Sequence, residues 1–336
     1  ETLFQEGVRE MRAERCTEAV AHYDRVANEF PSSRFVSSAL YNGGLCLKNA
    51  ERYDESAERF ERLLREVPQS SDVKHARFQL CEIYLETEAW EAGLAEADAL
   101  LARTDLVSDE RVEAMARHAQ LLLGAGQVQE AGREARSTLS WVRTRRGDER
   151  VRDVYFTAAA NYVLAETFRL NAAAMSVPEG NVAVQRPVLE RRAAIMLRAQ
   201  RAYFDTMRHT HAEWAAAAGY QIGAMYDAFW QAIMSAPVPP PQNALPESDV
   251  PIYEQEYREY LARLVKPLIR HSIRFWELTL LMVERTNVDT VLVAGGVKKW
   301  KGELVGFDVP RLSAELDTSR DHIFEAAGIE RDLFAS

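Results

Sequence analysis

The sequence predicts an all-α protein built from stacked pairs of antiparallel helices. Two observations carry this prediction. A pattern of small and aromatic residues repeats at a fixed interval along the first half of the chain, and apolar residues recur at helical spacing between the repeats. The 336 residues are 47% apolar, which is enough for a core and excludes a chain that is disordered throughout. No apolar run reaches the roughly 18–20 residues that cross a bilayer as a helix.

The repeat is clearest between residues 15–33 and 52–70, which match at an offset of 37 residues. The matched positions are Ala19 with Ser56, Tyr23 with Phe60, Val26 with Leu63 and Pro31 with Pro68. A second step of 37 residues leads from Ser56 to Gly93, and a weaker fourth copy places Ala131 in the same position. A fixed interval over four copies indicates a repeat architecture.

Each repeat unit is predicted to hold two helices. The small residue of the second helix lets the two helices approach closely, and the aromatic residue that follows fills the space beside it. The closing Pro ends the second helix, because Pro lacks a backbone donor and clashes with the preceding turn. One pair cannot bury its apolar face alone, so neighbouring pairs are expected to stack into a superhelix.

This pattern resembles the tetratricopeptide repeat (TPR). The resemblance is carried by Glu29-Phe-Pro-Ser-Ser-Arg-Phe-Val-Ser-Ser-Ala-Leu-Tyr-Asn-Gly-Gly44, where a Pro-polar-Ser turn precedes an Ala-x-Tyr-x-x-Gly helix. The segment is similar to the long-repeat TPR proteins of the bacterial cell envelope, namely outer-membrane assembly lipoproteins of the BamD type and Tol-Pal-associated proteins. It is also similar to TPR components of gliding-motility machinery. The resemblance covers residues 1–145, and 150–286 more loosely, and implies a right-handed α-solenoid that binds proteins.

The sequence divides the chain into three parts. Residues 1–148 are predicted to hold four TPR-like helix pairs, and residues 149–290 two enlarged, loop-inserted pairs. Residues 291–336 form a non-repeat C-terminal tail that caps the solenoid, docks in its groove or pairs with another subunit. Helices are expected over 150–174, 188–208, 212–234 and 251–286, with strand only as a trace within 297–310. A loop is expected to close near Pro187, and Pro267 to kink or divide the last helix.

Motifs for catalysis are sparse, so the sequence predicts no enzyme, no cofactor and no catalytic residue. A glycine-rich phosphate loop and a His-Glu-x-x-His motif are both missing from the sequence. The net charge of −10 makes nucleic acid an unsuitable partner. His209, His211 and Glu213 lie close together in sequence, and a metal enzyme that uses them is the alternative. The three cysteines are interpreted as buried small hydrophobes.

The remaining candidate site is the concave groove of the solenoid, which the first helix of every pair lines. Projecting the repeat onto these helices gives a mixed apolar and polar surface, suited to an extended or helical peptide segment of a partner protein. The predicted partner-binding residues are Phe4, Val8, Met11, Tyr41, Leu45, Lys48, Phe78, Glu82, Leu85, Gln120 and Leu123. The apolar members of this set are expected to be exposed.

The sequence and the resemblance together predict a non-catalytic scaffold that helps to assemble or anchor a multiprotein complex of the bacterial cell envelope, such as a motility machine. The chain begins with neither an initiator Met nor a leader, so we expect a removed leader and attachment through an N-terminal lipid anchor. The expected location is the periplasm or the outer membrane, and the tail is expected to mediate self-association. The alternative is a cytoplasmic TPR regulator that sequesters a signalling or secretion partner.

Overall fold

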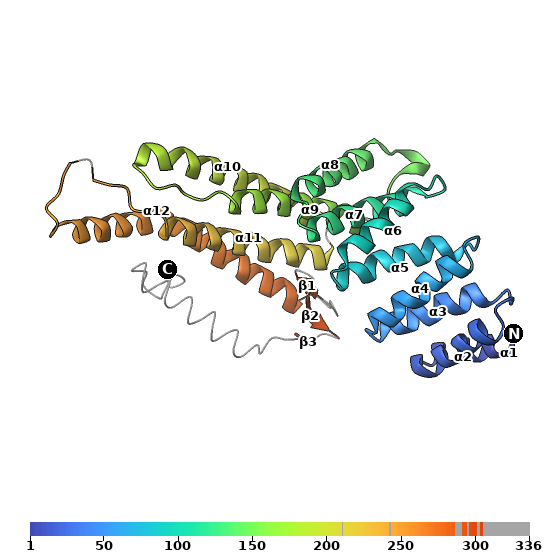
Figure 1. Cartoon of the computed structure of the whole chain (residues 1–336). Coiled ribbons are helices and arrows are strands. Elements are labelled where there is room, and N and C mark those ends of the chain that lie inside the picture. The colour runs from blue at the N-terminus through green and yellow to red at the C-terminus, as the bar shows by residue number, and fades with distance from the viewer. Residues whose placement is uncertain (210, 242, 286–290, 294–295, 301–302, 305–336) are drawn as a thin grey trace. The chain divides into compact units, whose positions relative to one another are not determined.

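The computed structural model describes residues 1–209, 211–241, 243–285, 291–293, 296–300 and 303–304 (Figure 1). Over these residues the regular secondary structure is α-helical apart from a short 3-10 turn and a small antiparallel sheet, and loops connect the elements. The predicted all-α class is therefore confirmed. The chain forms two compact units, Glu1–Phe156 and Thr157–Ser336.

The first unit is a row of helix pairs. Their order is α1 (Thr2–Arg12), α2 (Cys16–Glu29), α3 (Val36–Asn49), α4 (Tyr53–Glu66), α5 (Asp72–Glu86), α6 (Trp90–Leu101), α7 (Ser108–Gly124) and α8 (Val128–Thr144). Each helix packs against the next one along the chain, and α3 and α5, like α5 and α7, also lie side by side. Figure 1 shows the successive pairs stacked in chain order. This is the TPR-like arrangement that the sequence predicts.

The turn inside each pair has the same backbone geometry. Glu14, Glu51 and Glu88 adopt φ values of 57°, 58° and 57°, and Gly126 adopts 74°. These residues follow one another at offsets of 37, 37 and 38 residues. A left-handed conformation costs a residue with a Cβ roughly 1–2 kcal/mol, so its recurrence at glutamate shows that the surrounding pair imposes it. The repeat is thus present in the backbone as well as in the sequence.

The close approach within each pair depends on small residues, as predicted. Ser56 is fully buried, and its Oγ donates a hydrogen bond of 2.8 Å to the carbonyl of Gly44. The Cys81 thiol meets the carbonyl of Gly93 at the corresponding place, with 3.9 Å between sulfur and oxygen. Ala19 and Ala131 occupy the same position in the other pairs and are also fully buried. The register assigned from the sequence therefore matches the packing.

The second unit contains longer helices. They are α9 (Tyr155–Ala173), α10 (Val182–Met207), α11 (Ala212–Met234) and α12 (Val250–Arg285). α11 packs against both α10 and α12. Gly223 of α11 lies against the indole of Trp276, where an added Cβ would come within 2.4 Å of Nε1. The indole Nε1 donates to the carbonyl of Tyr220 at 3.2 Å, which ties α12 to α11.

Two predicted helix starts in this unit are wrong. α9 begins at Tyr155, after the expected residue 150. α10 begins at Val182, before the expected residue 188, because the Asn181 side chain accepts a hydrogen bond from the Val184 N–H and caps the helix. Pro187 therefore lies inside α10, where it removes only the bond to the exposed Ala183 carbonyl group. Pro267 lies inside α12 and does not divide it.

A small antiparallel sheet follows α12. Its strands are β1 (Val291–Val293), β2 (Gly296–Trp300) and β3 (Glu303–Leu304), in the order β1-β2-β3. Val293 pairs with Gly296, and Trp300 pairs with Glu303. β1 begins before the segment 297–310, to which the sequence analysis had restricted strand. The rest of the predicted tail, residues 305–336, lies outside the described residues.

Candidate protein-binding face of the first helices

The predicted binding residues lie on the first helices of the four pairs. Because α3, α5 and α7 lie side by side, their side chains form one surface, which we call the first-helix face. Its central part comprises Tyr41, Leu45 and Lys48 of α3, Phe78, Glu82, Leu85 and Glu86 of α5, and Glu113, Arg117, Gln120 and Leu123 of α7. Phe4, Val8 and Met11 are the corresponding residues of α1.

The apolar members of this face are more buried than the sequence analysis expected. Phe78 is only 5% exposed and belongs to the core between α5, α6 and α7. Phe4 stacks on Phe35, with 5.0 Å between ring centroids, and Tyr41 meets Phe60 edge-on at 5.6 Å. The other apolar members are half-buried: Val8, Met11, Leu45, Leu85 and Leu123. The expectation that the apolar members are exposed is therefore wrong for Phe78, and the others are only partly exposed because they also fill the space between neighbouring helices.

A chain of ion pairs crosses the face from α3 to α7. Lys48 Nζ lies 2.5 Å from Glu82 Oε1 and donates to Gln79 Oε1 at 2.7 Å. The other oxygen of Glu82 accepts from Arg117 Nη2 at 3.1 Å. Arg117 Nε then donates to Glu113 Oε1 at 2.8 Å. Alternating charges on three helices are thus linked by short contacts, and we call this chain the charge ladder.

Partial burial and the neighbouring charges shift the pKa values of residues in the charge ladder. Burial opposes a charge on Glu82, but the nearby Arg117 and Lys48 outweigh it and the pKa of Glu82 is lowered. Burial also opposes the charge on Arg117, but Glu113 and Glu82 outweigh it and its pKa is raised. The Arg117 guanidinium further lies over the Phe156 ring, 5.2 Å from the centroid. These shifts favour the charged forms of Glu82 and Arg117, whereas burial raises the pKa of Glu113.

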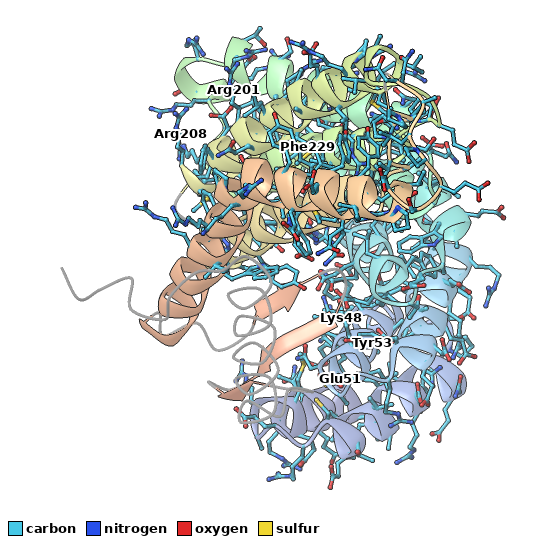
Figure 2. All side chains as sticks on the ribbon, turned by 90° about the vertical axis from the view of Figure 1, so that its left-hand side faces the viewer. Lys48, Glu51, Tyr53, Arg201, Arg208 and Phe229 are labelled. Carbon is cyan, nitrogen blue, oxygen red and sulfur yellow. The ribbon has the colours of Figure 1, made fainter. Side chains whose placement is uncertain are left out.

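Glu86 is the acidic group on this face that the ladder leaves out. It is half-buried and makes no hydrogen bond or ion pair within the part of the chain that the structure describes. Burial, and then the charge of Glu82, raise its pKa. Burial, and then the nearby charges of Glu86 and Glu51, raise the pKa of the Tyr53 phenol. Figure 2 shows Lys48, Glu51 and Tyr53 together around the turn between α3 and α4.

Three further residues of this face were not predicted from the sequence, namely Gln79, Glu113 and Arg117. The repeat positions projected from the sequence do not include these residues. Their side chains extend sideways and contact a neighbouring side chain or helix. The available signal was the spacing of opposite charges, since Lys48 and Glu82 are 34 residues apart and Glu82 and Arg117 are 35 apart. Such spacings are slightly shorter than one repeat and connect adjacent first helices.

The alternative metal site does not form a cluster. His209 Nε2 lies 3.1 Å from the side-chain nitrogen of Asn161, and burial lowers the pKa of His209. No group of three or more His, Cys, Asp or Glu side chains is placed to hold a metal ion, among the residues with a described position. Cys46 and Cys81 are buried and Cys16 is half-buried. Burial raises the pKa of the Cys81 thiol to about 12, as expected for a structural cysteine.

No helix within the described ranges is long and apolar enough to cross a membrane.

Comparisons with known proteins identify similar folds only. No protein-family model matches the chain, and no curated protein matches it. The chain is similar to the solved structure of MamA, residues 41 to the end, from Desulfovibrio magneticus RS-1, at 13% identity and a TM-score of 0.43. That match covers 62% of this chain and 93% of MamA. A tetratricopeptide repeat protein from Parabacteroides merdae matches at 12% identity and a TM-score of 0.42, over 83% of this chain and 98% of that one.

Proposed function

We propose that this protein is a non-catalytic adaptor that binds a segment of a partner protein along the first-helix face. The observation that carries the proposal is Glu86, a half-buried carboxylate without an ion pair, in a row of half-buried apolar groups. Leu85 directly precedes Glu86 in α5, and Tyr41 and Leu45 belong to the neighbouring helix α3. A row that combines apolar contact with one unsatisfied charge suits an extended or helical peptide.

The charge ladder supports the same proposal through rigidity. Lys48, Glu82 and Arg117 are held by contacts to one another, so little side-chain freedom remains to be lost when a partner binds. Ordering a free, rotamer-rich side chain at an interface costs roughly 0.5–1.5 kcal/mol. A surface fixed in advance avoids much of that cost. The ladder also holds α3, α5 and α7 in one relative position, which a partner that spans all three helices requires.

The finer proposal concerns the cellular setting. The long repeat and the Pro-polar-Ser turn at 31–33 support a scaffold of a bacterial envelope complex, with a motility machine as one example. In this proposal the protein lies in the periplasm or at the outer membrane, held by a lipid anchor. Fractionation of cells that express the full-length gene tests it. A cytoplasmic protein would instead support a regulator that sequesters a signalling or secretion partner.

Site-specific photo-crosslinking in the native cell tests the binding face directly. A photoreactive residue at Asn49 or Gln120 places the probe on first helices, whereas the exposed Glu58 of α4 and Glu91 of α6 provide second-helix controls. We expect a crosslinked partner from Asn49 and Gln120 and none from the controls. Crosslinks that arise only from Glu58 and Glu91 would place the interaction on the opposite side and refute the proposal.

A further inference from the structure

The outward side of α10 carries a concentration of positive charge in an acidic protein. Residues 182–208 contain six arginines and two carboxylates, although the whole chain has a net charge of −10. Arg186 and Arg208 are neutralised by ion pairs of 2.7 Å to Glu190 and Asp205. Arg198 and Arg201 are exposed and form no ion pair within the described ranges, and the Arg198 guanidinium lies over the Phe168 ring, 4.4 Å from the centroid. Figure 2 shows Arg201 and Arg208 on the outer side of the ribbon.

An exposed apolar residue accompanies these arginines. Leu197 is 52% exposed and directly precedes Arg198. Arg198 and Arg201 are three residues apart, so they project from the same side of the helix. We call Leu197, Arg198 and Arg201 the α10 patch. Single exposed leucines are common, but this one lies beside two unneutralised cations.

The start of α12 carries negatively charged residues with the same spacing as Arg198 and Arg201. Residues 247–260 contain five carboxylates and one arginine. Glu256 and Glu259 are exposed, three residues apart, and form no ion pair in the portion of the chain that the structure covers; Glu259 Oε1 accepts a hydrogen bond of 3.0 Å from Gln255 Nε2. Tyr260, which directly follows Glu259, is 52% exposed. We call Glu256, Glu259 and Tyr260 the α12 patch.

We propose that two copies of this chain associate through these patches, with α10 of one copy antiparallel to α12 of the other. Each charged pair spans about 4.5 Å of helix rise, so the two pairs match in length. In the antiparallel orientation Arg198 faces Glu259, Arg201 faces Glu256 and Leu197 faces Tyr260. One register therefore pairs both charges and covers both exposed apolar groups.

The occupant of each patch is a second copy because a single copy leaves both patches open. α10 and α12 both pack on α11, yet the residues of both patches remain exposed to solvent. An unrelated acidic partner would satisfy the arginines of α10 but would leave Tyr260 and its carboxylates uncovered. Exposed ion pairs are screened by salt, so the association is expected to weaken as the ionic strength rises.

Sedimentation velocity of the full chain at low and high salt tests this proposal. We expect a species larger than the monomer at low salt that dissociates at high salt. Arg198→Glu with Arg201→Glu, and separately Glu256→Arg with Glu259→Arg, should each weaken the association by about tenfold or more, because like charges then face each other. Helical circular dichroism and the melting temperature confirm that these surface variants remain folded.

Mixing the two variants gives the decisive outcome. The variant with Arg198→Glu and Arg201→Glu has two negative patches, and the variant with Glu256→Arg and Glu259→Arg has two positive patches. Each patch of one variant is therefore complementary in charge to a patch of the other, and the mixture should associate as the wild-type protein does. Arg136→Glu with Arg143→Glu in α8, both exposed positions, is the control and should leave the association unchanged. The proposal is overturned if the wild-type chain stays monomeric at low salt, if either patch variant associates normally, or if the mixture does not associate.

Discussion

Gly44 of α3 lies directly against the ring of Phe60 in α4. A Cβ added at Gly44 would stand 2.7 Å from the Phe60 Cζ atom, closer than real Cβ contacts. The neighbouring Gly43 differs, since a Cβ there would lie 3.6 Å from the Tyr23 side chain, an ordinary contact distance. Two adjacent glycines of one helix therefore have different roles, and only Gly44 sets how closely the helices approach.

The first prediction compares these two glycines. Gly44→Ala should lower the free energy of unfolding by about 1–3 kcal/mol, because the added methyl group overpacks the contact with Phe60. Gly43→Ala should be neutral or should stabilise the protein by up to about 1 kcal/mol, because Ala favours a helix interior over Gly. Urea unfolding of both variants measures the difference. Equal effects would contradict the packing described for this pair.

The second prediction concerns Phe78. Phe78→Ala should destabilise the first unit by about 3–5 kcal/mol, since it removes a ring that is only 5% exposed. Exposed Phe30, which is 52% exposed at the end of α2, provides the control. Phe30→Ala should change the free energy of unfolding by less than about 1 kcal/mol. A cost for Phe78→Ala as small as that for Phe30→Ala would mean that the ring is exposed after all.

The third prediction concerns the charge ladder. Glu82→Gln leaves Lys48 and Arg117 without the carboxylate that they share. Removing one member of a buried pair costs about 3–5 kcal/mol, but the Glu82 side chain is 36% exposed, so we expect about 1–2 kcal/mol. Glu58→Gln breaks a surface pair with Arg59 in which Glu58 is 62% exposed, and should cost less than about 1 kcal/mol.

The ladder also predicts a pH dependence. The folded state lowers the pKa of Glu82, so its ionisation stabilises the fold above the unfolded value of about 4.3. This stabilisation is lost as the pH falls through the lower, folded pKa. The difference in unfolding free energy between the wild type and Glu82→Gln should therefore shrink as the pH falls below about 4.3. A difference that stayed constant over that range would refute the assignment.

The fourth prediction reverses the sign at Glu86. The folded state raises its pKa, so ionised Glu86 opposes folding above that value. Glu86→Gln should stabilise the protein at pH 7 by less than about 1 kcal/mol, since the side chain keeps contact with water. The effect should vanish below about pH 4, where the carboxyl group is protonated in both states. Destabilisation by Glu86→Gln at pH 7 would reveal a favourable contact within the chain.

The helix pairs of the first unit could be predicted from the sequence because small residues recur where helices touch. Ala19, Ser56 and Gly93 are spaced by one interval. Ala19 and Ser56 are fully buried, and a Cβ added at Gly93 would clash with Leu121. The start of α10 could not be predicted in the same way. Pro187 is an apparent helix breaker, whereas the cap at Asn181 is one weak local signal in a loop.

The position of the first-helix face could be predicted from the sequence, but the burial of its side chains could not. Projection of the repeat located Tyr41 and Phe78, yet it could not show that Phe60 of the same pair covers part of the Tyr41 ring or that α6 and α7 bury Phe78. It also omitted Arg117, because a long side chain that bridges two helices is indicated by the spacing of opposite charges, which is 35 residues to Glu82, and not by the position of apolar residues in the repeat. Contacts between repeats depend on the distance between stacked helix pairs, and a single sequence does not give that distance.

Hydrogen exchange of the full chain with its captured partner tests the central claim most directly. The account predicts that the partner slows exchange in α3 and α5, which carry the first-helix face around Glu86. Exchange in the second helices α4 and α6 should change much less. Slower exchange confined to α4 and α6, or to the second unit alone, would contradict the assignment of the binding function to the first-helix face.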